Sequence, residues 1–160
     1  MAQIRNHLKW CLKDPDRLKE VKPDNSLAQK HLEKSEYNAE VMKLLETSKK
    51  YDWALNAGFY AIYHCFLAIL AKYGYESKNQ SCTVTVLLKL TEDKKLDFDK
   101  DLILQFNRLD VDKEASSPTI RESREASTCG VKTEVNANEL EIIKELVKKA
   151  QRETIRVLIG

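Results

Sequence analysis

Apolar and small side chains recur at helical spacing between residues 24 and 49, while the positions between them are mostly charged or polar. Asn25 or Ser26 precedes the first turn and suits an N-cap, because its side-chain oxygen can accept a backbone N–H. The pattern predicts an amphipathic helix that runs to about Lys49. Its buried stripe is expected to consist of Ala28, Leu32, Ser35, Ala39, Met42 and Leu45.

The next stretch, from about Asp52 to Tyr73, is apolar on nearly every side. Within it, residues 54–71 form a run of 18 without a charged side chain. A membrane-spanning helix needs about 20 predominantly apolar residues, so the run is borderline in length. It contains Asn56, Gly58 and His64 and has charged neighbours. We therefore expect the buried central helix of a bundle and no membrane span.

Shorter elements are expected after this helix, for which Gly74 is a suitable C-cap. Residues 76–80 are predicted to form a loop. Ser81 is a suitable N-cap for a short helix through residues 84–90, although the β-branched residues there leave a strand as the alternative. A further helix is predicted over about residues 98–113.

The two ends of the chain have different patterns. Residues 1–23 are predicted to be an N-terminal extension with one short helix, which Pro15 ends. Residues 24–160 are predicted to be the helical bundle. Its last helix is expected to begin at Asn138, which forms a capping box with Glu141, and to continue to the C-terminus.

Composition supports one all-α domain. The chain has 160 residues, of which 42% are hydrophobic and 32% charged, with only 4 Gly and 3 Pro. Few helix breakers and many good helix formers favour a helical protein large enough to bury a core. The net charge of +2 argues against a strong general nucleic-acid binder, although it leaves room for a local basic patch.

The four cysteines, Cys11, Cys65, Cys82 and Cys129, contain no C-x-x-C pair and have no histidine at a finger-like spacing. This spacing argues against a zinc site and against a disulfide framework. Cys65 lies in the most apolar stretch and is expected to be a small core residue. We therefore expect no metal, no cofactor and a reducing, cytoplasmic location.

Several segments together resemble the HEPN family (higher eukaryote and prokaryote nucleotide-binding domains). The stretch FYAIYH, from Phe59 to His64, is similar to the Arg-x-x-Tyr-Tyr-Ala-Met-Phe-His pattern on the second helix of members. QSCTVTVLL resembles a His-Ser-Cys-Thr-Ile stretch in prokaryotic members, and WCLKD resembles their N-terminal segment. ESREASTCGVKTEV resembles the arginine-containing element between their third and fourth helices. The resemblance covers roughly residues 8–158.

This resemblance implies an up-and-down four-helix bundle, usually dimeric. Members include metal-independent ribonucleases, toxin or antitoxin components paired with a small nucleotidyltransferase, and proteins that only bind nucleotide or a partner protein. The chain is similar to stand-alone prokaryotic members related to the nucleotidyltransferase-associated group.

The ribonuclease members share an Arg-x4–6-His motif. The histidine can exchange a proton with a 2′-OH or a leaving oxygen, and the arginine stabilises charge on the phosphate. This chain has the histidine, His64, but not the arginine. Asn56 lies one position beyond the motif's window and is neutral, and Gln80 stands where relatives often have a second histidine.

Asn56, Tyr60 and His64 follow an i, i+4, i+8 spacing and form a polar stripe on an apolar helix. Three interpretations of this stripe remain. It can be a hydrogen-bonded seam, either within the bundle or across a dimer interface, a pocket for nucleotide or RNA, or a nuclease site. Arg121 and Arg124 can restore a His/Arg pair if they approach His64, or else pair with nearby glutamates.

The aromatic residues Phe59, Tyr60 and Tyr63 can stack on a base, but at this spacing they are more often core residues. No role is assigned to His7 or His31.

We therefore predict a non-catalytic HEPN protein, a homodimer that binds nucleotide, RNA or a partner such as a nucleotidyltransferase. The expected ligand-binding residues are Asn56, Tyr60, Tyr63, His64, Arg121 and Arg124. A metal-independent ribonuclease with His64 as its catalytic residue is the first alternative, and a purely structural interaction module is the second.

Overall fold

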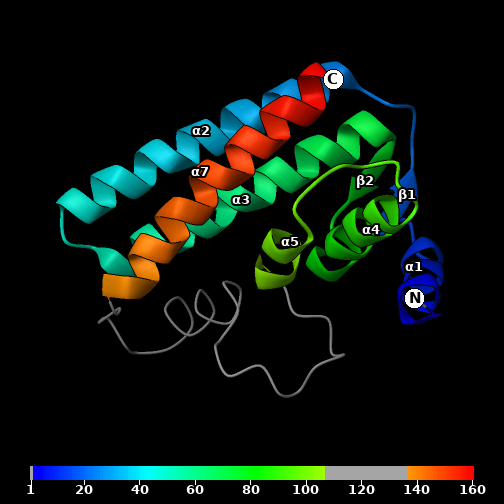
Figure 1. Cartoon of the computed structure of the whole chain (residues 1–160), viewed down its shortest axis with the longest axis horizontal. Coiled ribbons are helices and arrows are strands. Elements are labelled where there is room, and N and C mark those ends of the chain that lie inside the picture. Colours follow the sequence, from blue (N-terminus) through cyan, green and yellow to red (C-terminus); the bar gives the residue numbers. More distant parts are fainter. Residues whose placement is uncertain (1, 107–136) are drawn as a thin grey trace.

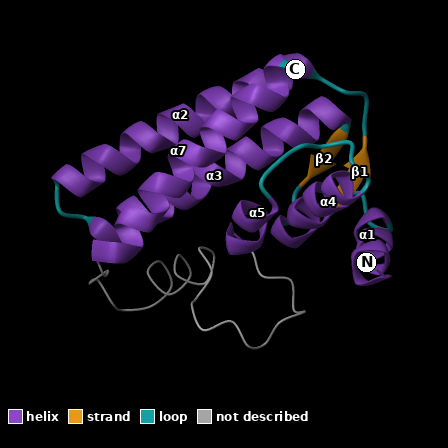
Figure 2. Cartoon of the chain, in the orientation of Figure 1, coloured by secondary structure: helices purple, strands orange, loops and turns teal. Residues whose placement is uncertain are grey.

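The computed structural model describes residues 2–106 and 137–160 (Figure 1). Figure 2 shows that helices dominate this part of the chain, with two short strands near the N-terminal helix. The predicted all-α fold is confirmed. In chain order the elements are α1 (Ala2–Leu12), β1 (Leu18–Glu20), α2 (Asn25–Thr47), α3 (Tyr51–Tyr73), β2 (Tyr75–Ser77), α4 (Gln80–Glu92), α5 (Lys100–Phe106) and α7 (Ala137–Ile159).

The three long helices α2, α3 and α7 lie side by side (Figure 1). The short turn at residues 48–50 makes α2 and α3 an antiparallel hairpin. α7 runs in the same direction as α3, since Ile143 packs beside Gly58 at one end and Lys72 donates to the Val157 carbonyl at the other. A Cβ on Gly58 would lie 2.3 Å from Ile143 Cγ2, so this glycine permits the close approach of the two helices.

The central helix α3 is buried along most of its length, as predicted. Among the described residues it is the one helix long and apolar enough to cross a membrane, but 72% of that apolar window is buried inside the protein. Such burial is typical of the core helix of a soluble bundle. Gly74 ends the helix in the left-handed region (φ 85°), which confirms the predicted C-cap.

The structure corrects two predicted N-caps by one or two residues. α2 is capped by Asp24, whose carboxylate accepts the backbone N–H of Leu27 at 2.9 Å. α4 is capped by Asn79 rather than Ser81, since the Asn79 side chain accepts the backbone N–H of Cys82 at 3.1 Å. α4 is a helix, so the strand alternative for this segment is wrong.

The loop predicted at residues 76–80 is partly wrong, because β2 occupies its start. β2 pairs antiparallel with β1, with Leu18 opposite Ser77 and Glu20 opposite Tyr75. Each strand has only three residues, too few for an alternating pattern to appear in the sequence. The pairing fixes the N-terminal segment against the end of α3.

The later helices agree with the prediction where they are described. α5 begins at Lys100, slightly after the predicted start, because the Asp99 carboxylate accepts the backbone N–H of Asp101. The rest of the predicted helix, from residue 107, lies outside the described residues. α7 begins at Ala137, so Asn138 stands in its first turn and not at the cap.

The prediction that no disulfide forms is wrong for one pair of cysteines. Cys11 on α1 and Cys82 on α4 are bonded, with their Cα atoms 5.8 Å apart. Seventy-one positions separate them in the sequence, so linear spacing gave no sign that α1 folds back onto α4. Cys65 is free and buried, as predicted, and Cys129 lies outside the described residues. A cytoplasmic location stays a prediction.

Candidate functional site

An open groove of about 310 Å³ lies between α2 and α3. We call it the α2–α3 groove. None of the described side chains that line it is acidic, and aromatic and amide groups are well represented. The lining consists of Lys34, Asn38, Val41, Leu45, Trp53, Asn56, Ala57, Tyr60 and His64.

The α3 wall of the groove contains three predicted site residues. Asn56, Tyr60 and His64 lie one helical turn apart, so they share one face of α3 and all line the groove. Each is only partly buried, whereas most neighbouring positions on α3 are fully buried. The polar stripe therefore faces an accessible surface and not a sealed core.

The α2 wall follows a matching spacing. Lys34, Asn38, Val41 and Leu45 recur every three or four residues and present one face of α2 to α3. The amide of Asn38 lies on this wall and that of Asn56 on the opposite one. An amide offers both hydrogen-bond donors and an acceptor, so the groove can match groups of either kind on a ligand.

One of the lining residues, His64, is paired with a second histidine on α2. The Nδ1 atoms of His31 on α2 and His64 on α3 lie 3.1 Å apart, within hydrogen-bonding distance. One ring donates and the other accepts, so the contact requires that at least one imidazole is neutral. Burial lowers the pKa of His31. Burial, with the nearby charges of His31 and Lys34, lowers the pKa of His64 to about 4. Both rings are therefore neutral near pH 7.

The groove also holds an exposed aromatic ring and a cation. The Trp53 side chain is 53% exposed, which is high for a residue of its size. The Lys34 ammonium lies 4.6 Å from the centre of the Tyr37 ring and close enough to His64 to disfavour its protonation. A flat apolar ring and a cation in one groove suit a ligand that has an aromatic base and an anionic group.

Tyr63, predicted to bind ligand, lies on a different side of α3. Its hydroxyl is 3.3 Å from Thr83 Oγ1 on α4, and its ring stacks against Phe106 with centroids 5.9 Å apart. Burial raises its pKa. Phe59 is fully buried in the same aromatic cluster, with its ring 6.4 Å from that of Tyr63 between centroids. Tyr63 is only partly buried, and ligand binding by this residue stays a prediction.

Arg121 and Arg124, which were predicted to bind ligand, lie outside the described residues. Gln80, at the place of a second histidine in relatives, is the first residue of α4 and does not line the groove. The histidine that contacts His64 is His31, on α2. His31 was assigned no role because its neighbours in the sequence are charged; the signal for it is the helix face that it shares with Lys34 and Asn38.

A second cluster of reactive side chains surrounds the disulfide. His7 Nε2 lies 3.2 Å from the Ser81 hydroxyl, and the His7 ring stacks on Trp10 with centroids 5.3 Å apart. The Arg17 guanidinium lies 3.7 Å above the Trp10 ring. Burial, and then the charge of Arg17, lowers the pKa of His7. His7, which was assigned no role, therefore has specific partners.

Within the part of the chain that the structure describes, the α2–α3 hairpin of this helical bundle carries an accessible groove, and the described side chains that line it are not acidic. The HEPN domain model matches residues 28–152, more than half of the chain, and the protein belongs to the HEPN family. Membership supports a nucleotide- or RNA-related function at the level of the family. A comparison with curated protein sequences gives no match. α1 and β1 precede the matched range.

Proposed function

We propose that the protein binds a nucleotide or a segment of single-stranded RNA in the α2–α3 groove without cleaving it. The observation that carries this proposal is the composition of the groove: an exposed Trp53, two amides, the Lys34 cation and no acidic group among the described lining residues. Its volume of about 310 Å³ is at the small end of ligand sites, which suits one base with its phosphate.

In this proposal Trp53 and Tyr60 stack on the base, an interaction worth about 1–3 kcal/mol per base. Asn38 and Asn56 bond the polar edge of the base, and Lys34 attracts the phosphate. Lysine binds phosphate as a point charge without the bidentate geometry of arginine. Ligand binding without strong transition-state stabilisation is therefore the function that these residues support best.

Tryptophan fluorescence provides a direct test. The chain has two tryptophans, and Trp10 is stacked on His7 away from the groove. A Trp10→Phe protein leaves Trp53 as the only reporter. Titration with ATP and with a short oligoriboadenylate is expected to quench Trp53 emission, and the affinity is expected to fall as salt rises.

The matched variants are Lys34→Ala and Lys43→Ala. Both lysines are exposed residues of α2, but nine positions place them on opposite sides of the helix. Binding is expected to weaken in Lys34→Ala and to stay unchanged in Lys43→Ala. No quenching by either probe, or equal affinity in both variants, would refute the proposal.

Metal-independent RNA cleavage is the second candidate, and the His31–His64 contact is the observation in its favour. Two neutral imidazoles can accept a proton from a 2′-OH, and Lys34 can face the phosphate. However, a pKa of about 4 makes His64 a weak base, and neutral rings are poor proton donors to the leaving oxygen. An assay in EDTA separates the candidates: cleavage that is lost in both His31→Ala and His64→Ala would establish the nuclease.

A homodimer remains part of the proposal. Tyr37 and Leu44 are seven positions apart on one face of α2 and are 57% and 68% exposed, which leaves an apolar surface beside the groove. Light scattering coupled to size exclusion is expected to show a dimer that Leu44→Lys weakens. A purely structural module would form this dimer and bind neither ATP nor RNA.

A small nucleotidyltransferase, as in toxin–antitoxin pairs of the family, is the partner protein proposed for this chain. Co-purification with a co-expressed nucleotidyltransferase, compared between wild type and Leu44→Lys, tests whether the same apolar face serves that contact. Failure to co-purify in wild type would remove the partner from the proposal and leave ligand binding unaffected.

A further inference from the structure

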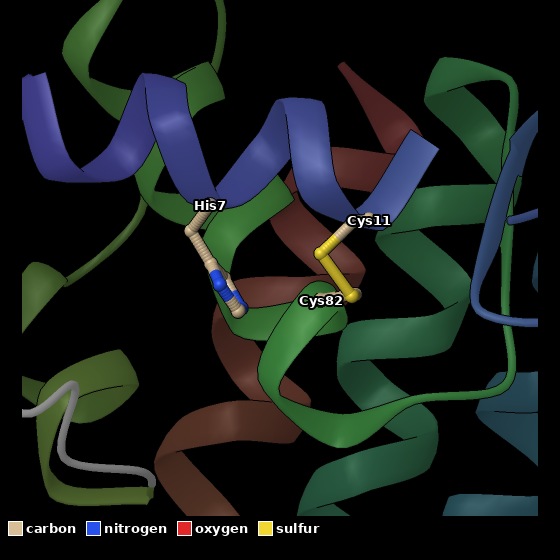
Figure 3. Close-up of side chains that lie close together, drawn as sticks. All are labelled: His7, Cys11 and Cys82. Atoms are coloured by element: carbon tan, nitrogen blue, oxygen red, sulfur yellow. A yellow bond between two sulfur atoms is a disulfide. The ribbon is translucent and has the colours of Figure 1, made fainter. Parts of the chain in front are cut away.

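The disulfide lies beside a histidine, so that three metal-ligating side chains converge where α1 meets α4 (Figure 3). His7 and Cys11 project from α1 toward Cys82 near the start of α4. The ligand atoms of the three residues all lie within 4.8 Å of one another. We call this group the His–Cys–Cys cluster.

The spacing along α1 favours chelation. His7 and Cys11 are i and i+4 on one helix, so their side chains lie on the same face one turn apart. Tetrahedral zinc with Zn–S bonds of about 2.3 Å holds two sulfurs about 3.8 Å apart. The separation of 5.8 Å between the Cα atoms of Cys11 and Cys82 leaves room for such a pair after small side-chain rotations.

The surroundings favour a fixed site that is buried on the side of the cysteines. Cys11 and Cys82 are fully buried, and His7 is partly buried. The Ser81 hydroxyl contacts His7 Nε2 at 3.2 Å and donates to the Asn79 side chain at 2.8 Å. Hydrogen bonds of this kind orient a histidine and are a regular feature around bound metals.

We propose that the reduced His–Cys–Cys cluster binds Zn²⁺, so that a metal ion replaces the disulfide as the link between α1 and α4. A dithiol reductant supplies two electrons and two protons to the Cys11–Cys82 bond and is itself oxidised to a disulfide. The two thiols then release two protons as their sulfurs bind the metal, while His7 binds through a ring nitrogen. A water molecule completes the four ligands. Thiolate and imidazole ligands together favour zinc over magnesium or calcium.

This inference departs from the expectation of no metal site, which rested on linear cysteine spacing alone. It also gives the N-terminal segment a link in either redox environment: the disulfide where conditions are oxidising, and the metal where they are reducing. The site is separate from the α2–α3 groove and does not depend on the proposed ligand.

Cobalt substitution tests the proposal on the full chain. Protein reduced with a phosphine and freed of metal is titrated with Co²⁺, which gives thiolate-to-cobalt charge-transfer bands and tetrahedral d–d bands. Zn²⁺ is then expected to displace the cobalt and to protect Cys11 and Cys82, but not Cys129, from alkylation, as read by peptide mass spectrometry. The oxidised protein is expected to give neither band.

Variants assign the ligands. His7→Ala and Cys82→Ser are each expected to weaken Co²⁺ binding at least about 10-fold, since even the loss of an outer-shell partner often costs this much. His7→Ala keeps both cysteines and can be prepared as the folded disulfide form before reduction, which separates a ligand effect from a folding defect. Cys129→Ser is the control and is expected to bind like wild type.

Two results would overturn the proposal. The first is reduced, folded protein that shows no charge-transfer band. The second is binding that survives in His7→Ala and Cys82→Ser but disappears in Cys129→Ser, which would place the metal on other thiols.

Discussion

The histidine pair predicts a specific loss of stability in mild acid. The pKa of His64 is about 4 in the folded protein, against 6.5 for an unperturbed histidine such as that of the unfolded chain. Between these values the unfolded chain binds a proton that the folded protein does not, so stability falls as the pH decreases from about 6.5 to about 4. Above that window the ring is neutral in both states and contributes no pH dependence.

The size of the effect follows from the pKa difference and the exposure of the ring. Taken in full, the difference corresponds to roughly 3 kcal/mol. His64 is only partly buried, so solvent screening reduces this to about 1–2 kcal/mol. The variant to compare is His64→Gln, which removes the titrating imidazole and keeps a side chain that can hydrogen-bond His31.

Urea unfolding at about pH 7 and about pH 4.5 measures the effect. Wild type is expected to lose about 1–2 kcal/mol more free energy of unfolding between the two conditions than His64→Gln. Subtracting the change in His64→Gln from the change in wild type cancels the contribution of the carboxylates, which titrate in both proteins. Histidine NMR on wild type should show His64 titrating well below His7 and His31. Equal pH dependence in the two proteins, or a His64 pKa near 6.5, would refute the reasoning.

The remaining predictions concern the packing and linkage of the bundle, and urea unfolding measures each. Gly58→Ala should lower the free energy of unfolding by about 1–2 kcal/mol, because the clash of the new methyl group with Ile143 outweighs the better helix propensity of alanine. The Gly58→Ala/Ile143→Ala double variant should regain part of this loss, and losses that simply add would contradict the clash. Cys82→Ser should cost about 2–5 kcal/mol in oxidised protein, and a reductant should abolish the difference from wild type. Asn79→Ala should cost about 1 kcal/mol and Asn79→Asp much less; equal losses would refute the capping role.

Helices with strong periodicity could be predicted from the sequence, and short or distant contacts could not. α3 and its end at Gly74 were predicted because a long apolar run and a glycine are local signals. β1 and β2 were missed because three residues carry no period. The bond between Cys11 and Cys82 was missed because it depends on how α1 docks, which no local pattern reports.

The candidate site was predicted on one side only. Asn56, Tyr60 and His64 stand out as polar residues on an apolar helix, so the α3 wall was visible in the sequence. His31 and Lys34 lie among many charged residues of α2, where a functional polar residue has no contrast with its neighbours. A comparison of the two helices as an antiparallel pair would have found them, since Lys34 and Asn38 repeat the spacing of the α3 stripe.

Both walls of the α2–α3 groove come from one hairpin closed by residues 48–50, so they are adjacent in the order of synthesis. Contacts between neighbouring elements cost little loop-closure entropy and can form early. α7, which joins the chain after residue 136, covers a different side of α3 and contacts Ser35 through Gln151. The ribosome therefore releases every residue of the groove before α7 exists. An unfinished chain can bring His31 and His64 together, while completion of the core waits for the last helix.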